Sequence, residues 1–503
     1  MSAGLEAVLQ PSVLLTILLS ALYGVFIGAI PGLTATMAVA LLIPVTFHLD
    51  PVHAIAAVVT LVACAIFAGD IPNALLRIPG TPSSAAYTDD VHALARRGLQ
   101  ERALGVCLVF SVAGGLFGSF ALMFAAQPLA GLATMFGTVE YFWLYLLGLG
   151  CAVVATRGSA LLAALGLILG LALSTVGLST AHGSARFTFG IPELYRGVSF
   201  IPAMIGLFGL SEVLRNLLAL GGTGGAEPPR AAPGGGGWRV GPVFGFALSA
   251  LWRRKGAALR SGAIGSLVGM LPGAGADIAA WVSLGLSRRL ARGAPQDDSD
   301  LLDGVSDATA ANNSALAGAW VPTLVFGIPG DSVTALVIGI LMMKDVTPGP
   351  GIFERDGGGL VVGVYTTFVV ANLVLLPVGF LAIKAGSALV RIPQRILLPI
   401  ILLCCIVGSY AVDSRRFDVG VMLAMGLLGF ALERWSVPLG PVVLGIVLGS
   451  PLEDRFIGTL NTSGGSLRAF LERPQSLVLA VLCLALWLSP LVGLVRRRFA
   501  ATR

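Results

Sequence analysis

Charged residues are scarce in this chain of 503 residues, and their scarcity excludes an ordinary soluble protein. Asp, Glu, Lys and Arg make up 12% of the sequence, whereas hydrophobic residues make up 56%. A soluble domain needs about a quarter of charged residues to cover its surface. The apolar runs recur along the whole length, so the sequence predicts a single all-α polytopic membrane domain with about ten to twelve membrane elements.

Patterns for metal, redox or hydrolytic chemistry are also missing. The six Cys lie in apolar runs without a CxxC pair, and the four His have no metal-ligand spacing. No nucleophile elbow is visible, and "GAGAD" (273–277) places its Asp one position beyond the Gly-x-Gly-Asp of intramembrane aspartyl proteases. We therefore expect a protein that is not an enzyme, with no cofactor and no metal beyond a possible Na⁺.

Basic residues are absent from the first part of the chain, where Arg77 is the first Arg or Lys. A cleavable signal peptide is therefore not expected, and a first membrane helix should begin at about residue 11. The net charge of +6 comes mostly from Arg and lacks interleaved aromatics, so it predicts membrane topology and no nucleic-acid partner. A Gly/Pro-rich linker (221–241) divides the chain into halves 1–220 and 242–503.

The two halves repeat. "GVFIGAIPG" (24–32) matches "GSLVGMLPG" (265–273), with the prolines 241 positions apart. "RIPGTPSSA" (77–85) matches "GIPGDSVTA" (327–335), with an offset of 250. The extra nine residues lie in the polar segment 287–300.

The Arg positions predict that the repeats have opposite orientations. In the first half the basic loop (95–102) follows the second motif, whereas in the second half the basic loop (287–300) lies between the motifs. Because positive loops face the cytoplasm, equivalent loops lie on opposite sides of the membrane. The amino terminus is then periplasmic, and the linker and carboxyl terminus are cytoplasmic.

Inverted repeats with helices interrupted by Gly and Pro are typical of secondary transporters. A broken helix offers free N–H groups to anions and free carbonyl groups to cations, and lipid tolerates such a break only beside a polar cavity. Four breaks, at Gly32, Gly80, Gly273 and Gly330, should therefore meet at the interface of the repeats.

The motifs resemble those of the large membrane subunit of the tripartite tricarboxylate transporters. The resemblance covers nearly the whole chain and rests on stretches that include "GAIPGLTATMAVALLIPVTF" (28–47), "RIPGTPSSAAYTDD" (77–90), "GMLPGAGADIA" (269–279) and "ATAANNSALAGAWVPTLVFGIPGDSVTALVIG" (308–339). The family often has Tyr-Gly-Gly where this chain has "AGD" (68–70), and Asn where it has Arg77.

The resemblance implies a bacterial inner-membrane carrier that works with a small membrane subunit and a periplasmic substrate-binding protein. It implies uptake of a tricarboxylate or dicarboxylate driven by a cation gradient, commonly of Na⁺ and otherwise of H⁺. The alternative is a passive anion channel or a receptor-like scaffold on a transporter fold.

Site residues follow from the four breaks and the polar residues near them. For the substrate carboxylates we predict Gly32, Thr34, Arg77, Gly80, Thr81, Ser83, Gly273, Gly275, Asn312, Gly330 and Ser332. For the coupling cation we predict Thr36, Asp277, Asn313, Asp331 and Thr334. Other roles remain open for these residues: Arg77 could pair with Asp70, the Asp and hydroxyl residues could cap helices, and the Asn residues could join helices.

Overall fold

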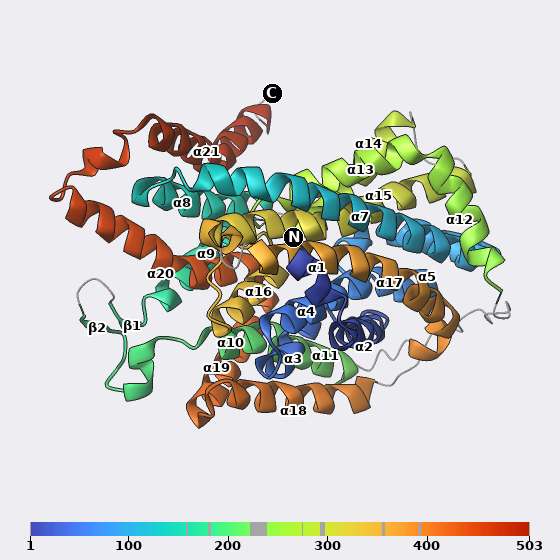
Figure 1. Ribbon diagram of the computed structural model, residues 1–503, viewed down its shortest axis with the longest axis horizontal. Helices are drawn as coiled ribbons and strands as arrows, with labels where there is room; N and C mark the ends of the chain where they lie inside the picture. Colours follow the sequence, from blue (N-terminus) through green and yellow to red (C-terminus); the bar gives the residue numbers. More distant parts are fainter. Residues whose placement is uncertain are drawn as a thin grey trace.

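The computed structural model describes residues 2–156, 159–179, 183–221, 239–273, 275–291, 297–354, 358–390 and 394–501. The predicted linker (221–241) lies mostly outside these residues. The described part of the chain is helical apart from one short hairpin (Figure 1). The first half contains α1 (Ser2–Val8), α2 (Pro11–Gly28), α3 (Ala35–Phe47), α4 (Pro51–Ala68), α5 (Asp70–Leu76), α6 (Thr88–Leu94), α7 (Gln100–Ala133), α8 (Thr138–Ala155), α9 (Ala160–Ser174), β1 (Gly177–Leu178), β2 (Ala185–Arg186), α10 (Phe200–Met204) and α11 (Ser211–Gly221).

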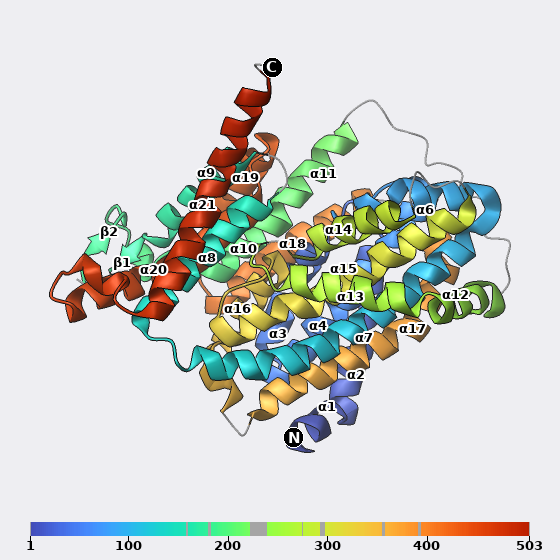
Figure 2. The same cartoon turned by 90° about the horizontal axis from the view of Figure 1, so that it is seen from above.

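The second half contains α12 (Gly241–Arg253), α13 (Lys255–Gly269), α14 (Gly275–Leu290), α15 (Asp298–Phe326), α16 (Ser332–Met343), α17 (Gly359–Leu389), α18 (Gln394–Asp413), α19 (Arg416–Arg434), α20 (Leu439–Thr462) and α21 (Pro474–Ala501). The hairpin β1–β2 and the end of α20 lie at one end of the molecule, and α12 lies at the other (Figures 1 and 2).

The helices are long and apolar enough for a multi-pass membrane protein. Within the described residues, seven are long and apolar enough to cross a bilayer, and four more are apolar but shorter. Large apolar side chains such as Phe124, Leu161 and Ile396 are exposed on the outside, where lipid replaces water as the solvent. The predicted all-α polytopic fold is confirmed.

Helix α15 is the central element of the core. Every residue from Gly304 to Val325 is buried, and the helix packs against α7, α13 and α14 (Figure 2). Its many Ala, Gly and Ser residues let these helices approach closely. Near its end the ring of Trp320 meets Phe368 of α17 edge to face at 5.4 Å.

The two glycines of the first GxxxG motif allow α2 to pack directly against α4. A β-carbon on Gly24 would lie 2.3 Å from the carbonyl oxygen of Leu61, and one on Gly28 would lie 2.4 Å from that of Ala65. Real β-carbons do not come so close, so only glycine permits this contact.

The second half repeats the contact between α13 and α15. A β-carbon on Gly265 or Gly269 would lie 2.3 Å from the carbonyl oxygen of Ala311 or Ala315, respectively. The carbonyl partners of the second half, Ala311 and Ala315, lie 250 positions after Leu61 and Ala65 of the first half. The second motifs of the two halves have the same offset. The repeat seen in the sequence is therefore a repeat of packing.

Contacts at the two ends of the molecule show that the repeats are inverted. The basic loop of the first half and that of the second half lie together, because Arg97 pairs with Asp298, and Arg288 pairs with Asp90 at 2.8 Å. The first of these loops (95–102) follows the second motif of its half, whereas the other (287–300) lies between the two motifs of its half. Elsewhere the Lys344 ammonium donates to the carbonyl oxygen of Phe47 at 2.6 Å, which joins the two remaining loops.

Candidate functional site

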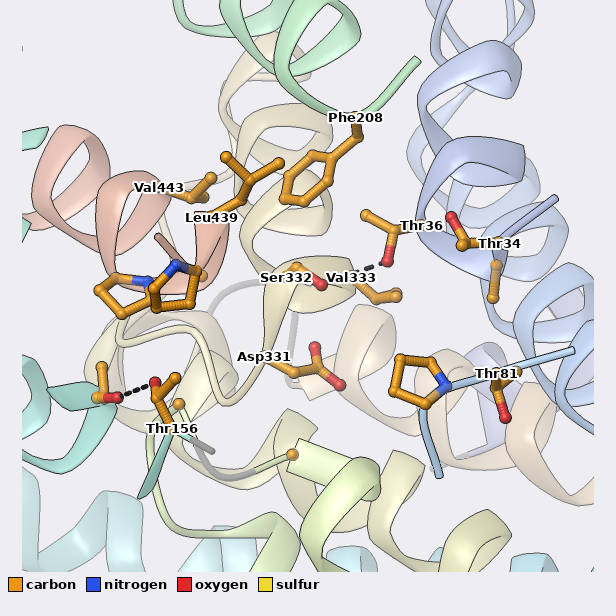
Figure 3. A pocket seen from close by; sticks show the side chains of 18 of the residues that line it. Thr34, Thr36, Thr81, Thr156, Phe208, Asp331, Ser332, Val333, Leu439 and Val443 are labelled. Atoms are coloured by element: carbon orange, nitrogen blue, oxygen red, sulfur yellow. Dashed lines mark hydrogen bonds between the residues drawn. The ribbon is translucent and has the colours of Figure 1, made fainter. Parts of the chain in front are cut away.

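The four interrupted segments meet around one cavity of about 620 Å³. Its wall takes residues from every one of them: Thr34, Thr36, Thr81, Pro82, Ser83, Gly273, Gly275, Asp331 and Ser332 (Figure 3). The remaining wall comes mainly from α4, α8, α11, α19 and α20. Residues from both halves thus share one chamber whose wall is mostly apolar, with hydroxyl and charged side chains placed within it.

The first segment separates α2 from α3. Gly32 has φ +85°, a left-handed conformation that favours glycine, and Thr34 then caps α3 by accepting the N–H of Met37 at 3.2 Å. Asn216 of α11 holds this turn, because its side-chain amide donates to the carbonyl oxygen of Gly32 at 3.2 Å.

The second segment, the motif 77–85, is held in a turn by hydrogen bonds of its own hydroxyl groups. The Thr81 N–H donates to the Ser84 hydroxyl at 3.1 Å, and that hydroxyl donates back to the Thr81 carbonyl at 2.9 Å. Ser83 lies 2.9 Å from the Thr81 hydroxyl. Gly80 lies against Gly69, where a β-carbon would come within 2.3 Å of the Gly69 Cα atom. Small residues are therefore needed where this turn crosses the end of α4.

The third and fourth segments are bonded to each other. The N–H of Gly273, which has φ +76°, donates to the carbonyl oxygen of Gly330 at 2.8 Å. Gly330 packs against Ala319, the position 250 residues beyond Gly69. Gly275 has φ +55° and its β-carbon would lie 3.0 Å from the Asp331 Cβ atom.

Asp331 caps α16, in agreement with the alternative that the sequence left open. Its Oδ1 atom accepts the N–H and the hydroxyl of Thr334, both at 2.8 Å, and the Thr334 hydroxyl accepts the N–H of Asp331 at 2.9 Å. The carboxylate also faces the cavity (Figure 3). Capping and ion binding can therefore coexist in one side chain.

Three helices begin at the cavity, and their amino-terminal ends bring partial positive charge to its wall. They are α3 after Thr34, α14 at Gly275 and α16 after Asp331. Each such end carries about half a positive elementary charge from unpaired N–H groups. These ends offer N–H donors to an anionic group, in a wall that also contains the acidic side chains of Glu212, Asp331 and Glu433.

Charged residues of α11 and α19 add an ion-pair cluster that the motifs did not predict. Arg215 pairs with the buried Glu212 and lies 3.8 Å from Glu433. Among the described lining residues, Arg215 is the only basic one. The sequence gives no direct signal for this cluster, because Glu433 is more than 200 positions away from Arg215.

Several predicted site residues lie away from the cavity wall. Arg77 is exposed and pairs with Asp89 at 2.7 Å, so the alternative pairing with Asp70 is wrong. The side-chain amide of Asn313 donates to the Ser111 carbonyl at 2.9 Å and joins α15 to α7. Asn312 is buried in the same helix, one turn before the lining residue Leu316.

Four predicted residues do not line the chamber but form packing or capping contacts within the interrupted segments. They are Gly32, Gly80, Gly330 and Thr334. Asp277 belongs to the first turn of α14, but its side chain lies outside the described part of the chain. Among the described residues, no group of three or more His, Cys, Asp or Glu residues could hold a metal ion.

Comparisons with known proteins agree with this architecture. The model of the tripartite tricarboxylate transporter TctA family matches residues 14–444. The chain is 31% identical over 495 residues to an "uncharacterized 52.8 kDa protein in TAR-I ttuC' 3'region" of Agrobacterium vitis, which covers 97% of this chain and 96% of that protein. A second A. vitis relative, an "uncharacterized protein in TAR-II ttuC' 3'region", is 31% identical over 229 residues, 45% of this chain and 94% of its own length.

No solved structure matches the chain. The family match covers most of the sequence, and the first relative covers nearly all of it. Members of this family form the large membrane subunit of tripartite tricarboxylate transporters, which work with a small membrane subunit and a periplasmic binding protein. The chain belongs to the tripartite tricarboxylate transporter TctA family.

Proposed function

We propose that this protein is the permease subunit of a carrier that imports a tricarboxylate or dicarboxylate across the bacterial inner membrane. The observation that carries the proposal is the chamber of about 620 Å³ where interrupted segments of both halves meet. Binding-protein delivery, a small membrane subunit and a periplasmic amino terminus are parts of the same proposal. The protein carries substrate and catalyses no covalent reaction.

The anion is held by the amino-terminal ends of α3, α14 and α16 and by Arg215. Helix N–H groups and a guanidinium are the donors that carboxylates prefer, and two guanidinium N–H groups can bind one carboxylate at once. Thr34, Thr81, Ser83 and Ser332 supply further hydroxyl donors at the wall. Arg215 replaces Arg77 as the carboxylate-binding arginine in this account, because Arg77 points to the exterior.

Transport is coupled to a gradient of Na⁺ or H⁺. The acidic and carbonyl groups beside the same segments, with Thr36, Asp277 and Asp331 foremost, would receive a coupling cation. One repeat then moves against the other to expose the chamber to each side in turn. The contact between Thr36 and Ser332, at 3.2 Å, lies on the boundary along which they separate.

Uptake into proteoliposomes tests the proposal. The chain is reconstituted with its small subunit and binding protein, and labelled dicarboxylates and tricarboxylates are offered with and without an inward Na⁺ gradient or pH gradient. Gradient-dependent accumulation of one carboxylate is the expected result. Uptake that only equilibrates, whatever the gradient, would favour the passive channel, and no uptake at all would contradict the proposal.

A further inference from the structure

Asp70 is a carboxylate buried inside the membrane domain without a basic partner. It begins α5 within the apolar span Pro51–Leu76, and only 1% of its surface is exposed. Among the described residues no ion pair reaches it, although Arg77 is on the same helical segment. An ionised carboxylate in such surroundings costs several kcal/mol, so groups of this kind usually have a function.

The hydrogen-bond partners of Asp70 are all neutral. The Tyr87 hydroxyl donates to its Oδ1 atom at 2.8 Å. The Asn73 side chain and the Cys107 thiol are close neutral neighbours of the carboxylate. Three neutral groups can hold either the ionised or the protonated form, because none brings a fixed charge.

These contacts continue into the second half of the protein. The Asn312 side chain, on α15, is a close neighbour of the Tyr87 hydroxyl. The carbonyl oxygens of Asn73 and Asn312 are fully buried and have no donor among the described groups. A buried acceptor left without a donor costs about 1–3 kcal/mol. A proton added to this cluster would supply such a donor.

The cluster lies directly behind the wall of the cavity. Ile66, Ser83 and Leu316 line the chamber. Asp70 follows Ile66 by four positions and Asn312 precedes Leu316 by four, while the 3-10 turn Ser84–Ala86 joins Ser83 to Tyr87. The polar groups are thus about one helical turn from the substrate chamber, and they join both halves.

We propose that Asp70 is the proton-binding group of this carrier and that its protonation couples substrate transport to a pH gradient. The inference rests on the proposed function; it names H⁺ as the coupling ion and assigns it to Asp70 in place of Thr36, Asp277 and Asp331. One H⁺ from the aqueous side converts the carboxylate into a carboxylic acid, and the same H⁺ leaves on the other side. Neutralising the buried charge lets the Asp70–Tyr87–Asn312 contacts rearrange between the halves.

Other titratable groups on the helices around α5 have partners of their own. On α6, Asp89 pairs with Arg77, Asp90 pairs with Arg288, and the His92 ring lies 3.0 Å from the Ala74 carbonyl. Lys384 of α17 pairs with Glu101 of α7 at 2.7 Å. The remaining titratable groups on the packed helices are His53 and Cys64 in α4, Arg102 and Cys107 in α7, and Tyr365 in α17. The His53 ring pairs with Asp50, and the Arg102 guanidinium lies over the Phe246 ring at 5.8 Å. Asp70 is left as the carboxylate that no cation balances.

The test compares wild type, Asp70→Asn and the control Asp89→Asn in proteoliposomes that contain the complete system. Asp89 is nearby but exposed, and its substitution removes a carboxylate of the same kind. Two rates are measured: exchange of labelled for unlabelled carboxylate without a gradient, and accumulation driven by a pH gradient. We expect Asp70→Asn to keep exchange and to lose pH-driven accumulation at least tenfold, while Asp89→Asn behaves like wild type.

If Asp70→Asn accumulates the carboxylate under a pH gradient at the wild-type rate, the proposal is overturned. Accumulation by wild type that follows a Na⁺ gradient and ignores a pH gradient would overturn it as well. If Asp70→Asn does not fold, Asp70→Glu decides: the proposal requires a displaced pH profile of the uptake rate, and an unmoved profile contradicts it. Absence of any carboxylate exchange by wild type would refute the proposed function itself, and the coupling proposal with it.

Discussion

The hydroxyl oxygens of Thr36 and Ser332 lie 3.2 Å apart although 296 positions separate them in the chain. Thr36 is in the first turn of α3 and Ser332 begins α16, so the contact brings together the amino-terminal ends of two helices from opposite repeats. A substrate or ion bound there would touch both halves at once. Binding can then favour one arrangement of the halves over another, which a carrier requires.

Replacing Gly273 by Ala should abolish most uptake. The residue has φ +76°, and a β-carbon would lie 2.4 Å from the Cα atom of Ala152 on α8. The segment must shift and lose its hydrogen bond to Gly330. Initial uptake rates in proteoliposomes measure the effect, for which we expect a loss of about tenfold or more. Gly131→Ala on α7 is the control, since nothing lies within 4 Å of its β-carbon position; equal rates for the two variants would contradict the account.

Arg215 and Arg77 should differ sharply in their effect on substrate affinity. Arg215→Gln removes the basic side chain of the cavity wall, so KM for the carboxylate should rise about tenfold or more, because a hydrogen bond to a charged group contributes about 1.5–3 kcal/mol. Arg77→Gln removes an exposed ion pair and should leave KM unchanged. Saturation curves of both variants supply the comparison. The reverse order of effects would restore Arg77 to the site.

Arg77 itself should be a source of local strain. It has φ 59° at the end of α5, and Gly327 at the equivalent place after α15 has φ 68°. Asn adopts this left-handed conformation more readily than Arg does. Arg77→Asn should therefore raise the thermal unfolding midpoint, even after loss of the exposed ion pair with Asp89. A thermal unfolding midpoint in detergent that falls below that of wild type would argue against strain at this residue.

Asp331 allows capping to be separated from ion binding. Asn caps helices as well as Asp does, so Asp331→Asn should leave thermal stability nearly unchanged, whereas Asp331→Ala should cost about 0.5–2 kcal/mol. If the carboxylate also binds the coupling cation, both variants should weaken the dependence of uptake on the cation gradient. Should Asp331→Asn retain full gradient dependence, Asp331 acts only as a cap.

The buried ion pairs of Asp307 should contribute more to stability than the exposed pair between Arg97 and Asp298. Asp307 is fully buried and pairs with Arg260 at 2.6 Å and with Arg254 at 3.3 Å. Asp307→Ala removes the carboxylate that pairs with Arg260 and leaves Arg254 with Asp303 alone, so it should cost about 3–5 kcal/mol. Asp298→Ala breaks an exposed pair with Arg97 and should cost at most about 1 kcal/mol. Unfolding midpoints of the two variants in detergent make the comparison, and a midpoint lowered more by Asp298→Ala would contradict this ranking.

The sequence predicted the interrupted segments because their signals are local. Pro31-Gly32 and Pro272-Gly273 mark positions where a helix must stop, and their repetition predicted that the segments meet. The Arg215–Glu433 contact is different, since it depends on how α19 packs beside α11 and has no counterpart in any motif. Arg77 was assigned to the site from its place beside a break. Its left-handed backbone instead directs the side chain to Asp89, twelve positions later.

Substrate protection of a thiol in the cavity tests the central claim most directly. Ser332→Cys, in a chain whose six native cysteines are replaced, is treated with a charged thiol reagent with and without the transported carboxylate. Ser466→Cys, in the exposed turn after α20, serves as the control. The account predicts that the carboxylate slows labelling at residue 332 and leaves residue 466 unaffected. Equal labelling of the Ser332→Cys thiol with and without a carboxylate that the protein transports would contradict the claim that this chamber binds it.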